Sequence, residues 1–454
     1  MIERLKIENL GPIKQADVDF KNLTIICGKN SVGKTYLSYT YYLLSKQLQT
    51  AISSCITLPE ELLFSVKEMA RANSISRKQL NLTIDSLGIT KEAIYSLLKK
   101  PSVQQDIYEE LGLDFNESSS VMADFGDWFD NKTLNSRSEI NLESDLSVNI
   151  KKKSGSQEFS ITLEISSIEE ASEDILINDV LFIIKVFLID YIFKLRQFPI
   201  TSERTGISLF YPELDQKLRG NLIEDNKKES IRYCDPIENN ISSIRQIRNA
   251  GRSYNNLDFQ YNTRKNIHDQ IADLLGGEYV TENKQLFFKP KNKDIRVPLR
   301  SSSGASKSLL LVDYFVKSIS RFGALIIDEP ELNLHVDSQK KIARLLCSIA
   351  NQGVQVVVTT HSDHFVREVN NLIMLSSPKV KSETKQKILS ESGIDSSSII
   401  SPNSVSTVVI NSTTNKTQKM DVSEYGIDLK LFNDEIMKGN DISNELMMSI
   451  YSGE

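Results

Sequence analysis

The chain has 454 residues, 40% of them hydrophobic, with 54 basic and 60 acidic side chains and a formal net charge of −6. This hydrophobic content excludes general disorder, and the near balance of charges excludes a chain that coats nucleic acid or anionic membrane over its whole surface. The length corresponds to two or three ordinary domains, or to one large domain with an insertion. The cysteines form no CxxC pair, and the first residues lack the apolar core of a signal peptide. We therefore expect a cytoplasmic protein.

The first fifty residues have the pattern of a strand, a loop and a helix. Apolar and polar residues alternate around 5–7 and 16–20, and 23–27 is a short apolar run typical of a strand buried on both faces. The next eight residues, 28–35, fit G-x-x-x-x-G-K-S/T and precede a helical stretch to about residue 48. The candidate nucleotide-binding residues here are Gly28, Lys29, Asn30, Ser31, Gly33, Lys34 and Thr35. In this pattern Lys34 reaches the β- and γ-phosphates and the Thr35 hydroxyl holds Mg²⁺.

Residues 49–272 are predicted to be an insertion that is mainly helical. The stretches 57–113 and 213–272 are polar and helix-like, and the apolar run 175–193 is interpreted as a buried helix. Alternating residues predict a β-hairpin near 140–165. The insertion has neither an internal repeat nor a heptad pattern long enough for an extended coiled coil.

Strands alternate with helices again from about residue 277. The predicted strands are 286–289, 324–327, 354–358 and 372–375, and the predicted helices are 306–320 and the stretch that ends at Gly353. Such alternation predicts a mostly parallel sheet with ligands at the carboxyl ends of its strands.

Chemically useful residues follow these strands. Asp328 and Glu329 come directly after one strand, where an aspartate can orient Mg²⁺ and a glutamate can polarise water. His361 follows the next strand and can reach a γ-phosphate. Ser303 and Gly304 offer a hydroxyl and free amides at the start of a helix. Alone, an acidic pair is more typical of a solvated turn, a single histidine of an ordinary surface group and a serine-rich loop of a linker. It is their order along the chain that favours a functional site.

In this order the motifs resemble those of ABC-type ATPases, in the branch with SMC, RecF and OLD-type proteins. The corresponding segments are Walker A (28–35), a signature-like stretch (301–307), Walker B (325–329) and the switch histidine His361. Residues 328–335 and 360–363 are similar to ATPase subunits of bacterial anti-phage defence systems, such as Septu-like and PARIS-like ones. Residues 200–204, Ile-Thr-Ser-Glu-Arg, are similar to a Pro-Ala-Glu-Arg stretch common in those proteins.

The resemblance implies an α/β fold, an ABC-type P-loop ATPase head with a mixed, largely parallel sheet. The head would be discontinuous, comprising 1–48 and 273–454, with 49–272 as the insertion. It also implies that two heads pair head to tail around ATP, with Ser303 and Gly304 of one chain contacting the nucleotide held by Walker A of the other. The implied roles are general base for Glu329, Mg²⁺ shell for Asp328 and Thr35, and γ-phosphate sensor for His361. The signature departs from the usual Leu-Ser-Gly-Gly-Gln, since 302–306 lack the second glycine and the glutamine.

For function, the resemblance implies an ATP-hydrolysing subunit of an anti-phage complex that controls a separately encoded nuclease of HNH or TOPRIM type. The alternative is a DNA-repair or chromosome-maintenance ATPase of the SMC/RecF type that binds duplex DNA. A protein of that class is expected to have a long coiled-coil arm or a continuous basic surface. The insertion has only a local cluster of basic residues over 245–265. A self-contained OLD-type nuclease is disfavoured because 376–454 contain no Asp-x-Asp pair. DNA contact by this chain stays open, and no membrane partner is expected.

Overall fold

The computed structural model divides into two compact units. It describes residues 2–71, 76–83, 87, 89–116, 118–125, 136–141, 146–152, 158–165, 173–187, 194–223, 233–250, 264–319 and 322–428. One unit comprises 1–5, 40–198 and 319–325, and the second comprises 6–39, 199–318 and 326–454. These units are defined by packing, and the boundaries of the insertion at 49 and 272 remain a prediction.

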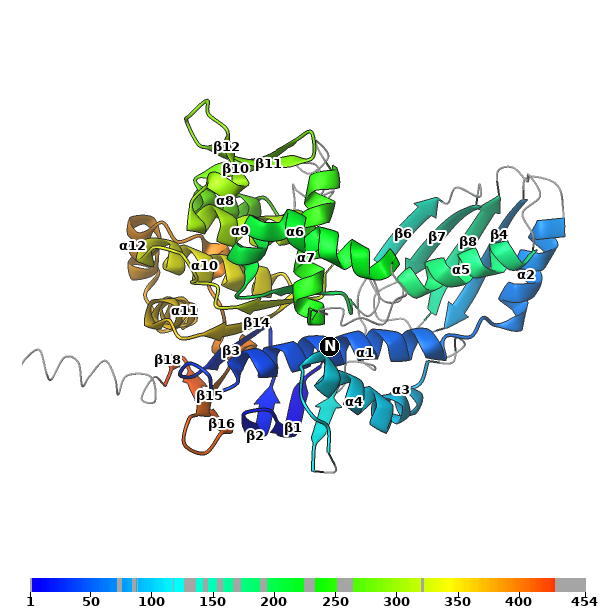
Figure 1. Cartoon of the computed structure of the whole chain (residues 1–454), viewed down its shortest axis with the longest axis horizontal. Helices are drawn as coiled ribbons and strands as arrows, with labels where there is room; N and C mark the ends of the chain where they lie inside the picture. The colour runs from blue at the N-terminus through cyan, green and yellow to red at the C-terminus, as the bar shows by residue number, and fades with distance from the viewer. Residues whose placement is uncertain are drawn as a thin grey trace, which may run out of the picture. The chain divides into compact units, whose positions relative to one another are not determined.

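The second unit contains all or part of eight neighbouring strands of the main sheet, in the order β1-β2-β16-β15-β3-β14-β13-β9 (Figure 1). The strand bounds are β1 Arg4–Leu10, β2 Ile13–Asp19, β3 Leu23–Cys27, β9 Gln197–Ile200, β13 Ala324–Asp328, β14 Gln355–Thr360, β15 Val405–Asn411 and β16 Lys416–Lys419. Both neighbours of β3, namely β14 and β15, run parallel to it, while β16 is antiparallel to β15. This mixed, largely parallel sheet confirms the predicted fold class.

The register of the parallel strands decides which loops meet. Cys27, the last residue of β3, pairs with Thr360 at the end of β14. Gly28 and His361 therefore start from the same edge of the sheet. Every residue of β3, β13 and β14 is buried, as expected of strands covered on both faces. The predicted strands over 23–27, 324–327 and 354–358 are thus confirmed.

The described part of the second unit also contains helices. Their bounds are α6 Arg204–Ile223, α7 Asp235–Ala250, α8 Lys265–Leu275, α9 Gly304–Lys317, α10 Val336–Asn351, α11 Asp363–Ser376 and α12 Ser382–Ser392. The helix α1 (Lys34–Cys55) begins in this unit, directly after the loop 28–33. One face of α10 is apolar and buried, and α10 packs against β14 and β3. A three-stranded antiparallel sheet, β10 (Gly277–Glu282), β11 (Gln285–Pro290) and β12 (Val297–Pro298), precedes α9.

The strand predicted over 372–375 is wrong. These residues lie in α11, and the strand that follows β14 in the chain is β15, about thirty positions later. Leu372, Ile373 and Leu375 are buried on the inner face of α11. A short apolar run that is buried on a helix cannot be told from a buried strand by its composition. At the end of the described chain, β17 (Val422–Ser423) and β18 (Gly426–Ile427) pair with each other, and β18 packs on α11.

The first unit contains a four-stranded antiparallel sheet in the order β4-β8-β7-β6. Its elements are α2 Glu60–Arg71, β4 Ser76–Thr83, α3 Lys91–Leu98, α4 Pro101–Glu110, β5 Ser120–Asp124, β6 Ser136–Asn141, β7 Leu146–Lys152, β8 Glu158–Ile165 and α5 Glu173–Phe187. The pair β7–β8 occupies the segment predicted as a hairpin. The strands β4 and β6 are not predicted by the sequence, because both are rich in polar residues.

The helix predicted over 175–193 is α5, which is described to Phe187. Val180, Ile183 and Ile184 are buried, but Phe182 is 60% exposed, so α5 buries one face only. It packs against α2 and β7. Within the described ranges, every helix is too short or too polar to cross a bilayer.

Candidate nucleotide-binding site

The loop between β3 and α1 requires glycine at two positions. Gly28 and Gly33 have φ of +150° and +103°, a region that side chains with a Cβ rarely adopt. A Cβ on Gly33 would lie 2.8 Å from Cγ1 of Ile13, and one on Gly28 would lie 2.9 Å from Cγ2 of Val32. The backbone is thus tightly folded around a point at the start of α1, as a phosphate-binding loop requires.

Lys34 is the first residue of α1 and is 7% exposed. Its Nζ donates hydrogen bonds to the carbonyl oxygens of Gly28 and Lys29, at 3.0 and 2.9 Å. The ammonium group therefore lies inside the loop, while the side chains of Lys29, Asn30 and Ser31 are exposed. A cation held there, at the positive end of a helix, attracts an anionic ligand.

Thr35 and Asp328 meet although 293 positions separate them in the chain. The Thr35 hydroxyl donates to Oδ2 of Asp328 at 2.8 Å, and the Thr359 hydroxyl donates to the other carboxylate oxygen. Asp328 is 2% exposed, and burial raises the pKa of its carboxyl group, while the two hydroxyl donors oppose that shift. The two residues predicted to share a Mg²⁺ ion are therefore in direct contact.

Glu329 has an unusual backbone conformation. Its φ is +49°, which costs a residue with a Cβ on the order of 1–3 kcal/mol. Its N–H donates to the carbonyl oxygen of Thr359 at 3.0 Å, so the turn after β13 is tied to the end of β14. The side chain is 24% exposed, and its Oε1 lies 3.3 Å from Nδ1 of His361, whose side chain is 50% exposed. The two predicted catalytic side chains thus lie side by side at the surface of the site.

Glu331 is a site residue to which the sequence analysis assigned no role. It is 6% exposed, and its Oε1 accepts hydrogen bonds from the Thr360 hydroxyl at 2.7 Å and from the N–H of His361 at 3.1 Å. The same oxygen lies 3.6 Å from Nδ1 of His361. Glu331 therefore fixes the segment that carries His361. The sequence feature that could have indicated Glu331 as a site residue is its position, two residues after Glu329.

Ser303 and Gly304 lie at the start of α9 and are exposed. The Ser303 hydroxyl caps the helix by accepting from the N–H of Ser306 at 3.1 Å, and it also contacts the Ser306 hydroxyl at 2.9 Å. A Cβ on Gly304 would lie 3.4 Å from the Cβ of Asn333, a tolerable contact. The hydrogen bonds of Ser303 thus stay within the first turn of α9, and the structure does not bring this pair to the loop 28–35.

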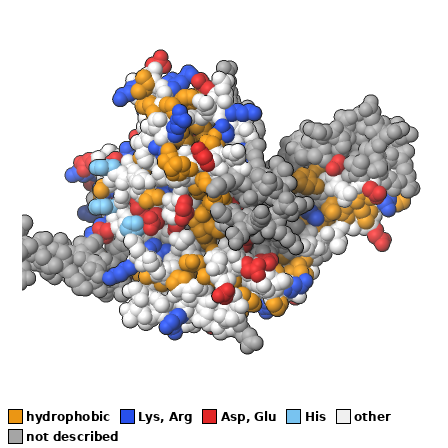
Figure 2. Space-filling view, viewed as in Figure 1, with side chains coloured by type: hydrophobic (Ala, Val, Ile, Leu, Met, Phe, Trp, Pro, Cys, Tyr) orange, Lys and Arg blue, Asp and Glu red, His pale blue; other side chains and the backbone are white. Residues whose placement is uncertain are grey.

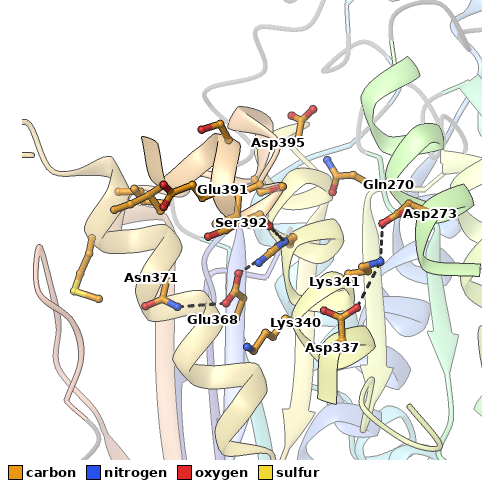
Figure 3. A pocket seen from close by; sticks show the side chains of 18 of the residues that line it. Gln270, Asp273, Asp337, Lys340, Lys341, Glu368, Asn371, Glu391, Ser392 and Asp395 are labelled. Carbon is orange, nitrogen blue, oxygen red and sulfur yellow. Dashed lines mark hydrogen bonds and ion pairs between the residues drawn. The ribbon is translucent and has the colours of Figure 1, made fainter. Parts of the chain in front are cut away.

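A large cavity lies elsewhere in the second unit, lined by α8, α10, α11 and α12, with a volume of about 1040 Å³ (Figure 3). Five of its charged side chains form ion pairs with one another. Arg344 contacts Glu368 at 2.6 Å, and Lys341 contacts Asp273 at 2.9 Å and Asp337 at 3.5 Å. None of the predicted nucleotide-binding or catalytic residues lines this cavity, so it is separate from the candidate site.

The sequence profile of the AAA ATPase domain family matches residues 1–366, so the chain belongs to that family and is an ATPase. No curated protein matches it in sequence.

Among solved structures, an SMC head bound to the C-terminal winged-helix domain of ScpA is 13% identical, with a TM-score of 0.37, 93% of this chain covered and 98% of that one. The Smc head domain of Pyrococcus furiosus, bound to the C-terminal domain of ScpA, is 15% identical, with a TM-score of 0.36 and coverage of 98% and 99%. The SMC head domain of Thermotoga maritima is 12% identical, with a TM-score of 0.33 and coverage of 93% and 99%.

The donor groups at the site fit the nucleotide and metal that the family implies. Mg²⁺ prefers hard oxygen ligands and is usually held by one or two protein groups together with substrate phosphates. The Thr35 hydroxyl and the Asp328 carboxylate, 2.8 Å apart, supply such oxygens beside the loop that encloses Lys34. These are the residues that would hold Mg²⁺ and the phosphate chain.

Replacing Gly33 with alanine should destabilise the protein more than the same change at Gly353. Both glycines have positive φ, but an added Cβ collides with Ile13 at Gly33 and meets nothing within 4 Å at Gly353. We expect Gly353→Ala to lower the free energy of unfolding by about 1 kcal/mol and Gly33→Ala by about 2–4 kcal/mol, from urea titrations. Equal losses for the two variants would show that the loop relaxes freely and is not a tightly constrained cradle.

Proposed function

We propose that this chain hydrolyses ATP at a site completed by a second copy of itself. Gly28–Thr35 of one copy would hold the phosphates, with Asp328 and Thr35 as the Mg²⁺ ligands. Bound Mg²⁺ would neutralise charge on the β- and γ-phosphates. Ser303 and Gly304 of the second copy would contact the γ-phosphate from the opposite side. ATP would then act as a removable link between two chains.

The hydrolysis step assigns distinct tasks to two side chains. Glu329 would accept a proton from the attacking water. The water oxygen would bond to the γ-phosphorus as the bond between the γ-phosphorus and the bridging oxygen breaks, and ADP would leave. His361 would donate a hydrogen bond to the γ-phosphate. Glu329 Oε1 lies 3.3 Å from His361 Nδ1, which supports the idea that both side chains act on the same γ-phosphate and its attacking water.

The contact between Thr35 and Asp328 is the strongest support for a nucleotide site. The Thr35–Asp328 hydrogen bond of 2.8 Å joins the loop after β3 to the end of β13, and Glu329 is the next residue in the chain. The phosphate loop, the metal ligands and the general base therefore belong to one compact unit. If the loop were only a chance glycine-rich turn, there would be no reason for it to lie beside Asp328 and Glu329.

A mixing experiment tests the shared site. Lys34→Ala and Gly304→Arg should each be inactive, because each removes one half of both sites in a homodimer. In an equimolar mixture about half of the dimers are mixed and hold one intact site, so activity should return to roughly one quarter of the wild-type rate. Gly304→Ala, which introduces only a Cβ, is the control and should stay active. Full activity of Gly304→Arg alone would show that the site lies within one chain.

We further propose that the ATPase controls a separately encoded nuclease in anti-phage defence. The motifs at 328–335 and 360–363 support this role. On the face shown in Figure 2, the described Lys and Arg side chains are interspersed with acidic ones, which favours DNA contact by a partner. Arg248, in the basic cluster, stacks 4.4 Å from the Tyr211 ring centre and donates to the Lys284 carbonyl oxygen at 2.6 Å.

The neighbouring gene offers the first test of that partner. An adjacent HNH gene supports a Septu-like system and a TOPRIM gene supports a PARIS-like system. Co-expression should then give a stable complex whose nuclease activity changes in Glu329→Gln. If neither gene is adjacent and duplex DNA stimulates ATP turnover by the chain alone, the DNA-repair alternative takes first place.

A further inference from the structure

Arg204 stands out among the side chains of the second unit. It is the first residue of α6, and it is the largest of the described side chains that are fully buried, with 1% exposure. Burial lowers the pKa of its guanidinium group to about 10, so it remains a cation at neutral pH. A buried cation is costly unless its donors are satisfied, so the contacts of Arg204 should reveal its role.

The guanidinium group joins segments that are distant in the chain. Its Nη1 donates to the carbonyl oxygens of Asp328 at 2.7 Å and Thr201 at 3.2 Å, and its Nη2 donates to the carbonyl oxygen of Glu329 at 2.6 Å. Its Nε donates to Ser308 on α9, to the hydroxyl at 2.8 Å and to the carbonyl oxygen at 3.2 Å. Arg204 therefore connects α9 to the backbone of Asp328 and Glu329, in the turn after β13.

Each of these acceptors is a carbonyl or hydroxyl oxygen. Arg204 thus holds the backbone of Asp328 and Glu329 and leaves both carboxylates to the site. The backbone of Glu329 needs such support because its φ is +49°. Ser308 strengthens the connection, since its hydroxyl also donates to the carbonyl oxygen of Leu332 at 2.9 Å, in the same turn.

We propose that Arg204 is a positioning residue that couples α9 to Glu329. This inference rests on the proposed shared site and describes how hydrolysis at that site is regulated. A nucleotide contacted by Ser303 and Gly304 at the start of α9 acts on Ser308 one turn later in the helix. A displacement of Ser308 would change its contact with Arg204, and Arg204 in turn holds the backbone of Glu329. Hydrolysis is thereby tied to the presence of the second copy.

The test separates positioning from folding and from binding. Arg204→Lys keeps the cation but cannot reach Ser308 and Glu329 together. We expect kcat for phosphate release to fall by about 10- to 100-fold, with the ATP dissociation constant within about threefold of wild type. The matched control is Arg344→Lys, a largely buried arginine of the separate cavity, for which kcat should stay within about twofold. An unchanged kcat in folded Arg204→Lys, or a loss of ATP binding equal to the loss of kcat, would overturn the proposal.

Ser308→Ala keeps the test decisive if Arg204→Lys does not fold. It removes one hydroxyl and should lower kcat several-fold at unchanged ATP affinity, chiefly at protein concentrations where dimers form. A kcat equal to wild type at all concentrations would rule out the connection through α9. The wild-type rate per chain, measured over the same concentrations, tests the shared site itself. If the wild-type rate per chain does not depend on protein concentration and Gly304→Arg is active, the shared site is refuted. If the wild-type rate does depend on concentration but Arg204→Lys and Ser308→Ala have wild-type rates, only the coupling is refuted.

Discussion

Lys34→Ala is expected to bind ATP at least about 100-fold more weakly than the wild type. The Lys34 ammonium group lies inside the loop, 3.0 Å from the carbonyl oxygen of Gly28 and 2.9 Å from that of Lys29. A nucleotide that enters this loop would replace these acceptors with phosphate oxygens, which form stronger, charge-assisted hydrogen bonds. Alanine removes the charge and the N–H donors of the ammonium group. The dissociation constant is measured by calorimetry with ATP and Mg²⁺.

The control for this prediction is Lys46→Ala. Lys46 is an exposed residue of the same helix, α1, so its replacement changes the net charge equally without touching the loop. It should alter the dissociation constant by less than about threefold. Equal affinities of Lys34→Ala and the wild type would mean that nucleotide binds somewhere other than the loop 28–35.

Glu329→Gln should lower ATP turnover by about 10²- to 10⁴-fold while ATP binding is retained. Glutamine has nearly the same shape as glutamate and faces the same backbone strain at φ +49°, but it cannot accept a proton from water. The contact with Nδ1 of His361 changes from an interaction with a carboxylate to a weaker hydrogen bond with an amide. Binding persists because the loop around Lys34 and the Thr35–Asp328 pair are unaltered.

The same variant should also accumulate as an ATP-bound dimer. If hydrolysis releases the two copies, blocking it leaves them joined, and light scattering should show twice the monomer mass with ATP but not with ADP. Glu383→Gln, at an exposed position in the first turn of α12, should behave as the wild type in both assays. A Glu329→Gln protein that stays monomeric with ATP would contradict the proposed link between nucleotide and assembly.

Much of this site was predictable because its pieces are local in sequence. The loop 28–35 combines glycines, a lysine and a threonine in fixed positions between a strand and a helix, and the structure has that loop between β3 and α1. The alternation of strands and helices also predicted that Gly28, Glu329 and His361 would start from one edge of the sheet. The pairing of Cys27 with Thr360 gives the physical reason, since parallel strands end at the same edge.

The remaining features depend on contacts between distant residues. Arg204 meets Ser308 across 104 positions and Asp328 across 124, and no local pattern indicates such contacts. The strand order is equally non-local, because β15 (405–411) lies next to β3 while 372–375 joins a helix. The polar strands β4 and β6 have little of the apolar alternation on which strand prediction depends.

The most direct measurement is the rate of phosphate release from ATP by the purified wild-type chain and by Glu329→Gln, in parallel and with Mg²⁺ present. We expect steady turnover by the wild type, loss of that turnover when Mg²⁺ is chelated, and a rate in Glu329→Gln at least about 100-fold lower. Equal rates for the two proteins would contradict the role of Glu329, because the base that activates water would then be another residue.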